Sequence, residues 1–123
     1  MDQWMSRKRS TDPLVSVDAA TEAALKTCSL MCKEVVAAYL SEEEAPRSEF
    51  GHRLLRAAAA IDAAAAAIET EADEQRATFA IAAPICRAAA AECRRSGFDP
   101  VLLRAAAACE RAAAVCEHPL PSD

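Results

Sequence analysis

The six cysteines are the residues of this sequence with the richest chemistry. They occur as one pair four residues apart and two pairs seven residues apart. Thiolates are soft ligands that select Cu(I), Zn(II) or iron–sulfur clusters over hard ions. A free cysteine is also a small apolar side chain that can simply fill a core. Six residues are therefore candidate metal ligands: Cys28, Cys32, Cys86, Cys93, Cys109 and Cys116.

The spacing of the cysteines shows what kind of element must position them. On a helix, Cys28 and Cys32 project from one face a single turn apart, which suits two ligands of one metal ion. Residues seven apart are separated by about 10 Å along a helix axis, too far to share one ion. The pairs at 86/93 and 109/116 must therefore find partners on other helices.

The composition predicts that these elements are helices. Among 123 residues there are 32 alanines and two glycines. Alanine loses no side-chain entropy on entering a helix, whereas strands favour β-branched and aromatic residues. The length suits a single domain of four helices of about 20 residues each. The fold class is therefore all-α.

Helix boundary signals divide the chain into four segments. We expect helices over 16–42, 48–71, 73–95 and 99–117. Pro46 separates the first two, and Ser48 and Asp73 are the expected N-caps of the second and third. Asp99 followed by Pro100 is the clearest helix start, because proline at the first helical position loses no hydrogen bond.

Short connections between these helices make sequential helices antiparallel neighbours. The predicted fold is an antiparallel up-down-up-down four-helix bundle over residues 16–118. Residues 1–15 are expected to form a disordered or loosely packed arm, and residues 119–123 a tail.

A seven-residue apolar repeat runs through each helix, and all the cysteines fall on its inward side. Counting from the turn between the third and fourth helices puts Cys86 and Cys109 opposite each other at mid-height. Cys28 and Cys32 should lie near the same level, so these four are the expected principal metal site. Cys93, toward one mouth of the bundle, and Cys116, toward the other end, are secondary ligands.

Charge and composition exclude several function classes. The net charge is −5, and the one basic run, residues 7–9, is best explained as a solvated tail rather than a nucleic-acid site. Neither a signal peptide nor about 20 uninterrupted apolar residues is present, so we expect a cytoplasmic protein with free thiols and no membrane contact. The two histidines form no nucleophile–base pair, so an enzyme is not expected. The expected partner is a metal ion, and the pattern is compatible with a homo-oligomer.

The segments ICRAAAAEC, residues 85–93, and AACERAAAVCEH, residues 107–118, resemble the cysteine-rich four-helix-bundle family of bacterial copper storage proteins. In that family a cysteine-rich third helix leads through a short turn into a last helix with further cysteines. The Cys28–Cys32 pair is similar to the family's Cys-x3-Cys pairs. The resemblance implies Cu(I) bound inside the bundle by thiolates.

The sequence also departs from the family pattern. Ala89, Leu102, Ala105 and Ala112 stand where the family has thiols, and the second helix has no cysteine. The resemblance thus implies a small copper-binding or buffering centre rather than a thiol-lined tube. Two alternatives remain open. One is an electron-transfer protein with a Cys₄ iron–sulfur cluster on Cys28, Cys32, Cys86 and Cys109, and the other is a metal-free interaction scaffold.

Overall fold

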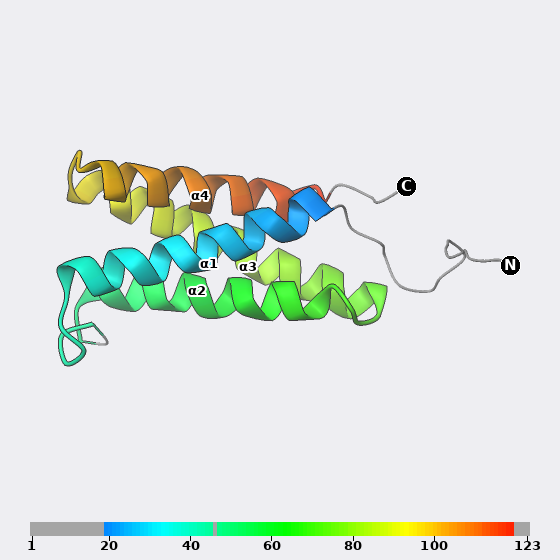
Figure 1. Cartoon of the computed structure of the whole chain (residues 1–123). Helices are drawn as coiled ribbons and strands as arrows, with labels where there is room; N and C mark the ends of the chain where they lie inside the picture. Colours follow the sequence, from blue (N-terminus) through cyan, green and yellow to red (C-terminus); the bar gives the residue numbers. More distant parts are fainter. Residues whose placement is uncertain (1–18, 46, 120–123) are drawn as a thin grey trace, which may run out of the picture.

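The computed structural model describes residues 19–45 and 47–119 of the chain. It contains four helices, and no strand occurs among the described residues. Their bounds are α1 (Ala19–Tyr39), α2 (Glu49–Ala67), α3 (Ala72–Ser96) and α4 (Pro100–Glu117). They run up-down-up-down as an antiparallel bundle, which confirms the predicted fold class (Figure 1). The predicted arm, residues 1–15, lies outside the described residues, as does all of the predicted tail except Pro119.

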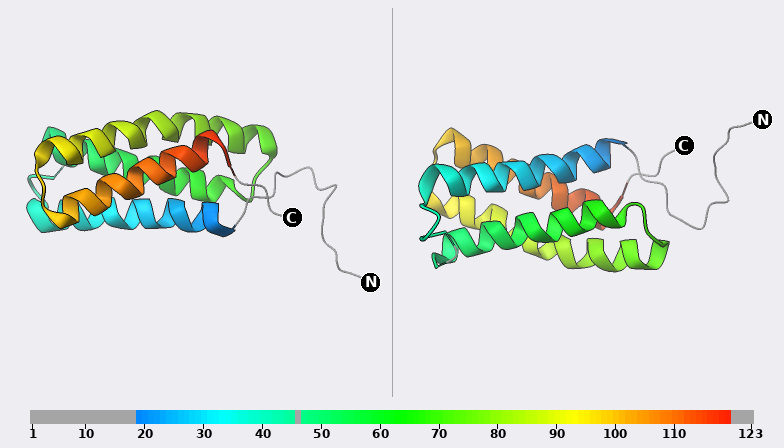
Figure 2. Two further views of the ribbon diagram at one scale, coloured as in Figure 1. Left: turned by 90° about the horizontal axis from the view of Figure 1, so that it is seen from above. Right: turned by 60° about the horizontal axis from the view of Figure 1, so that its bottom comes forward.

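The four helices form a closed ring. Each packs on its neighbours in the sequence, and α1 packs on α4 to complete the ring. The start of α1, the end of α4 and the α2–α3 connection lie at one end of the bundle, and the α3–α4 turn lies at the other (Figures 1 and 2). Every helix therefore presents one face to a shared core.

Two helix starts follow the sequence signals. The Ser48 hydroxyl oxygen accepts a 3.0 Å hydrogen bond from the Gly51 amide at the start of α2. The Asp99 carboxylate accepts a 2.8 Å bond from the Val101 amide, and Pro100 is the first residue of α4. Each side chain stabilises an amide that has no partner within its own helix. Both predicted N-caps are confirmed.

The end of the first helix was predicted wrongly. Helix α1 ends at Tyr39, three residues before the expected boundary at 42. The Glu44 carboxylate accepts a 2.9 Å hydrogen bond from the Ser41 amide, and the Ser41 hydroxyl oxygen accepts a 3.1 Å bond from the Glu44 amide. This reciprocal pair stabilises a separate turn, so the chain leaves α1 earlier.

The junction between the second and third helices also differs from the expectation. Helix α2 ends at Ala67 rather than near residue 71, because the Thr70 hydroxyl donates a 2.7 Å hydrogen bond to the Ala67 carbonyl oxygen and closes the end. The N-cap of α3 is Glu71, not Asp73, and it caps without a side-chain hydrogen bond. Asp73 lies in the first helical turn and pairs with Arg76.

The connection between α1 and α2 fits closely against the start of α2. A side chain at Gly51 would collide with the Ala45 carbonyl oxygen and with the Leu40 side chain. Glycine is therefore required here to let the connecting loop approach the helix backbone.

Small side chains dominate the core. Alanines on α2, α3 and α4 are fully buried, among them Ala57, Ala64, Ala82, Ala89 and Ala105. Small residues at the contacts allow helix axes to come close together. All the cysteines are buried among these alanines, which confirms that the cysteines face inward.

Candidate metal centre

Three of the cysteines form a cluster where α1 packs against α4. The Cys109 Sγ atom lies 3.7 Å from the Cys28 Sγ atom and 3.5 Å from the Cys32 Sγ atom. All three sulfurs lie within 4.8 Å of one another. The four-residue spacing puts Cys28 and Cys32 on the same face of α1, and the antiparallel neighbour α4 supplies the third thiol. Each of the three side chains is 0% exposed.

The cluster is arranged to hold one thiolate readily. Hydrogen bonds from Cys109 and Cys28 lower the pKa of Cys32, in spite of its burial. The pKa of Cys109 is raised, because its thiol hydrogen bonds with Cys28 and Cys32, and then burial, favour the protonated form. Thiols that donate to a neighbouring sulfur stabilise its negative charge and make a second ionisation harder. The cluster therefore favours a single thiolate shared among hydrogen-bonded thiols.

The environment of Cys28 includes a fourth thiol. Its hydrogen bond with Cys109 favours the Cys28 thiolate, but the contacts with Cys32 and Cys86, together with burial, outweigh this effect and raise the pKa of Cys28. Cys86 thus reaches the cluster from α3, beside Cys28. It is not a member of the compact group of three sulfurs.

The two remaining cysteines have a different environment. Burial is the main reason that the pKa of Cys93 and that of Cys116 are each raised to about 11. The charge of Cys32 also raises the pKa of Cys93, which lies on the Cys32 side of the core. Cys116 lines a surface pocket with Phe79 and Pro84 of α3. Neither residue belongs to the three-sulfur group.

The predicted site residues therefore divide into three sets. The structure brings together Cys28, Cys32 and Cys109, places Cys86 next to them, and leaves Cys93 and Cys116 apart. The sequence interpretation missed Asp62 of α2, which binds the α1 turn that carries the cysteine pair. The available sequence signal was Ser29, a polar residue that directly follows the inward-facing Cys28. In the structure Ser29 is only 5% exposed.

The distances in the cluster match a single coordinated ion. Sulfurs that each lie about 2.3 Å from one metal ion are about 4 Å apart from each other. The sulfur–sulfur distances of 3.5 and 3.7 Å need only a small expansion to reach that value. The three thiols are thus prearranged around one position.

Comparison with known families agrees with this geometry. A family model described as copper storage protein matches residues 16–121. The chain belongs to the copper storage protein family. No curated protein and no solved structure gives a significant match.

Membership of the copper storage protein family indicates copper binding, and the buried cysteine cluster is a group of residues that can hold a metal ion. Within the part of the chain that the structure describes, no helix is both long and apolar enough to cross a membrane.

Proposed function

We propose that this copper storage family member binds and buffers Cu(I) at a first site formed by Cys28, Cys32 and Cys109. The observation that carries the proposal is the convergence of three buried sulfurs within 4.8 Å. Binding rather than catalysis is the activity, and the cytoplasm is the proposed location.

The donor set favours Cu(I) among the soft metals. Cu(I) is satisfied by two or three thiolates, whereas structural zinc sites are nearly always tetrahedral with four ligands. The compact group supplies three sulfurs, with Cys86 outside it. An iron–sulfur cluster is held by cysteines on different irons around an inorganic core, so its ligand sulfurs must surround a larger space. Thiols in mutual hydrogen-bonding contact at 3.5 and 3.7 Å leave no room for such a core between them.

The capacity of the protein is small. With no thiolate shared between ions, six thiols supply three Cu(I) ions at two thiolates each. Ala89, Ala105 and Ala112 are 0% exposed and Leu102 is 4% exposed, so the places where the family has thiols are filled by apolar core. Further ions would use Cys86, Cys93 and Cys116 as secondary ligands. The role that follows is buffering of a few ions per chain rather than bulk storage.

The experiment is a Cu(I) titration of reduced, metal-free protein under nitrogen, in competition with the chromogenic chelator bathocuproine disulfonate. We expect at least one tightly held ion per chain, and copper-loaded protein without chelator should be colourless. The variant C109S should bind this first ion more weakly, because only the Cys28–Cys32 pair of the cluster remains, whereas the matched control C116S should bind it as wild type does.

The same samples test the alternatives. Brown protein with bound iron and sulfide after anaerobic purification would support the iron–sulfur alternative instead. Wild-type protein that leaves all the Cu(I) with the chelator would overturn the proposal and support the metal-free scaffold.

A further inference from the structure

Helix α2 contributes no cysteine, but its Asp62 binds the turn of α1 that carries two of them. The Ser29 hydroxyl donates a 2.6 Å hydrogen bond to Asp62 Oδ1, and the Lys33 ammonium group donates a 3.1 Å bond to Asp62 Oδ2. Ser29 directly follows Cys28, and Lys33 directly follows Cys32. One carboxylate therefore contacts the neighbour of each member of the cysteine pair.

The same relation holds at the other cysteines. The Arg87 guanidinium forms two hydrogen bonds, 3.0 and 2.6 Å long, with the Glu117 carboxylate. Arg94 forms a similar pair, 3.0 and 2.7 Å long, with Glu110. These four residues directly follow Cys86, Cys116, Cys93 and Cys109. Every cysteine is thus followed by a residue that bonds to a neighbouring helix.

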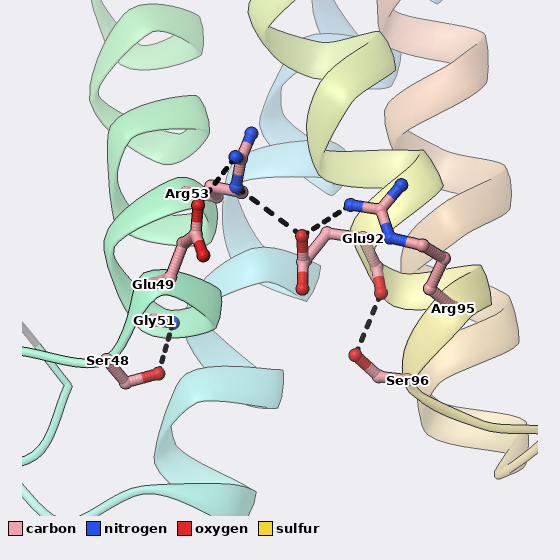
Figure 3. Close-up of polar contacts among 7 residues, drawn as sticks. All are labelled: Ser48, Glu49, Gly51, Arg53, Glu92, Arg95 and Ser96. Carbon is pink, nitrogen blue, oxygen red and sulfur yellow. Dashed lines mark hydrogen bonds and ion pairs between the residues drawn. The ribbon is translucent and has the colours of Figure 1, made fainter.

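The α2–α3 contact has a related bridge. Glu92, which directly precedes Cys93, lies between Arg53 of α2 and Arg95 of its own helix (Figure 3). Its distances to the two guanidinium groups are 3.4 and 2.6 Å. Polar contacts between helices therefore accompany the cysteines on the outside of the bundle.

We propose that Asp62 is a positioning residue for the thiol cluster, acting through Ser29. Successive residues of a helix are about 100° apart around its axis, so a bond to the residue after a cysteine fixes the direction of that cysteine. With α1 held in this rotation, Cys28 and Cys32 point toward Cys109 on the opposite neighbour. Asp62 does not bind the metal itself but holds the helix segment that carries two ligands, as residues around the ligands do in other metal proteins.

The two bonds to Asp62 have unequal weight. Ser29 is 5% exposed, so losing its acceptor leaves a buried hydroxyl without this bond. The Lys33 and Asp62 side chains are 55% and 53% exposed, and ion pairs at such exposure contribute little. The Ser29 bond therefore carries most of the positioning.

This inference rests on the proposed function for its copper readout, so the experiment has a second, copper-free readout. The variants are D62A, S29A and K33Q, and the matched control is E117Q, which removes the charge from the Arg87 bridge between α3 and α4 and weakens it. The first readout is affinity for the first Cu(I) ion by chelator competition. The second is the yield of α1–α4 disulfide when metal-free protein is treated with diamide, which takes two electrons and two protons from a pair of adjacent thiols.

We expect D62A and S29A to lower the affinity for the first Cu(I) ion about tenfold and to lower the disulfide yield. K33Q should weaken binding about twofold or less, and E117Q should change neither readout even if it lowers the thermal midpoint. Equal losses in D62A and E117Q would overturn the inference, because they would reflect general destabilisation. So would unchanged readouts in both D62A and S29A.

The two proposals can fail separately. If wild-type protein does not bind Cu(I), the proposed function fails while the disulfide yields still decide whether Asp62 positions the thiols. If wild-type protein binds Cu(I) but D62A and S29A do so equally well and cross-link equally well, only the positioning role fails. Where D62A does not fold, S29A decides, because it removes one hydroxyl and leaves the carboxylate in place.

Discussion

The three-thiol cluster at the α1–α4 contact and the outlying pair Cys93 and Cys116 contain the same residue type at almost the same burial. Cys32 and Cys93 are both 0% exposed, but their pKa values move in opposite directions. Hydrogen bonds from two thiols lower the pKa of Cys32, whereas burial raises that of Cys93 to about 11. Burial disfavours a thiolate, and a neighbouring thiol that donates a hydrogen bond favours it.

An inward position does not by itself make a cysteine a metal ligand. A thiol must lose its proton to bind a metal, and in a core a neighbouring thiol that donates a hydrogen bond favours that loss. The cluster provides such neighbours because α1 and α4 bring three thiols to the same height along the bundle. Cys116 shares its surroundings with Phe79 and Pro84 instead.

The largest expected effect is a difference in copper affinity between a variant in the three-thiol cluster and a variant at an outlying cysteine. Replacing Cys32 with serine removes a metal–sulfur bond and the charge of one thiolate ligand, so affinity for the first Cu(I) ion should fall by about 100-fold or more. Replacing Cys93 with serine should change this affinity far less. The measurement is chelator competition on both variants, and equal losses would show that Cys93 belongs to the first site.

A second test converts an outlying cysteine into part of a pair. Ala89 is 0% exposed and lies four residues before Cys93 on α3, so A89C should place a thiol beside it. The Cu(I) capacity should rise by about one ion per chain, because a pair of thiolates suffices for Cu(I). Metal analysis after gel filtration measures the capacity. The control A88C adds a thiol at an exposed position, and an equal gain there would argue against the inward-pair explanation.

A third test asks whether the three-thiol cluster and the outlying cysteines are already in place before metal binds. The alanine-rich apolar core is complete without an ion, so metal-free reduced protein should keep its helical far-ultraviolet circular dichroism. Added Cu(I) should raise the thermal midpoint by preferential binding to the folded state. A mostly unfolded metal-free spectrum would mean that metal, rather than packing, brings the cluster together.

The smallest expected effect comes from removing an outlying cysteine that only fills the core. C93A removes one buried sulfur atom, which should cost about 1 kcal/mol and lower the thermal midpoint by about 4 °C. First-site Cu(I) affinity should stay within about twofold of wild type. Thermal unfolding followed by circular dichroism gives the first value and chelator competition the second. A stable variant with much weaker copper binding would place Cys93 among the ligands.

The sequence predicted the fold well because its signals are local. Alanine content, the apolar repeat and the caps at Ser48 and Asp99 act within single helices, and the structure contains these features. The ends of α1 and α2 were predicted less well. There, hydrogen bonds of Ser41 with Glu44 and of Thr70 with Ala67 compete with continued helix, and the apolar pattern does not report them.

The pattern of residues indicates which face of each helix carries its cysteines, because helical periodicity is a property of one segment. That Cys109, rather than Cys86, completes a compact group with the α1 pair is visible only in the packed bundle. That choice depends on how far each helix is rotated about its axis and shifted along it. Rotation and shift are set by the packing of all four helices and by contacts such as Ser29 with Asp62, which join residues far apart in the chain.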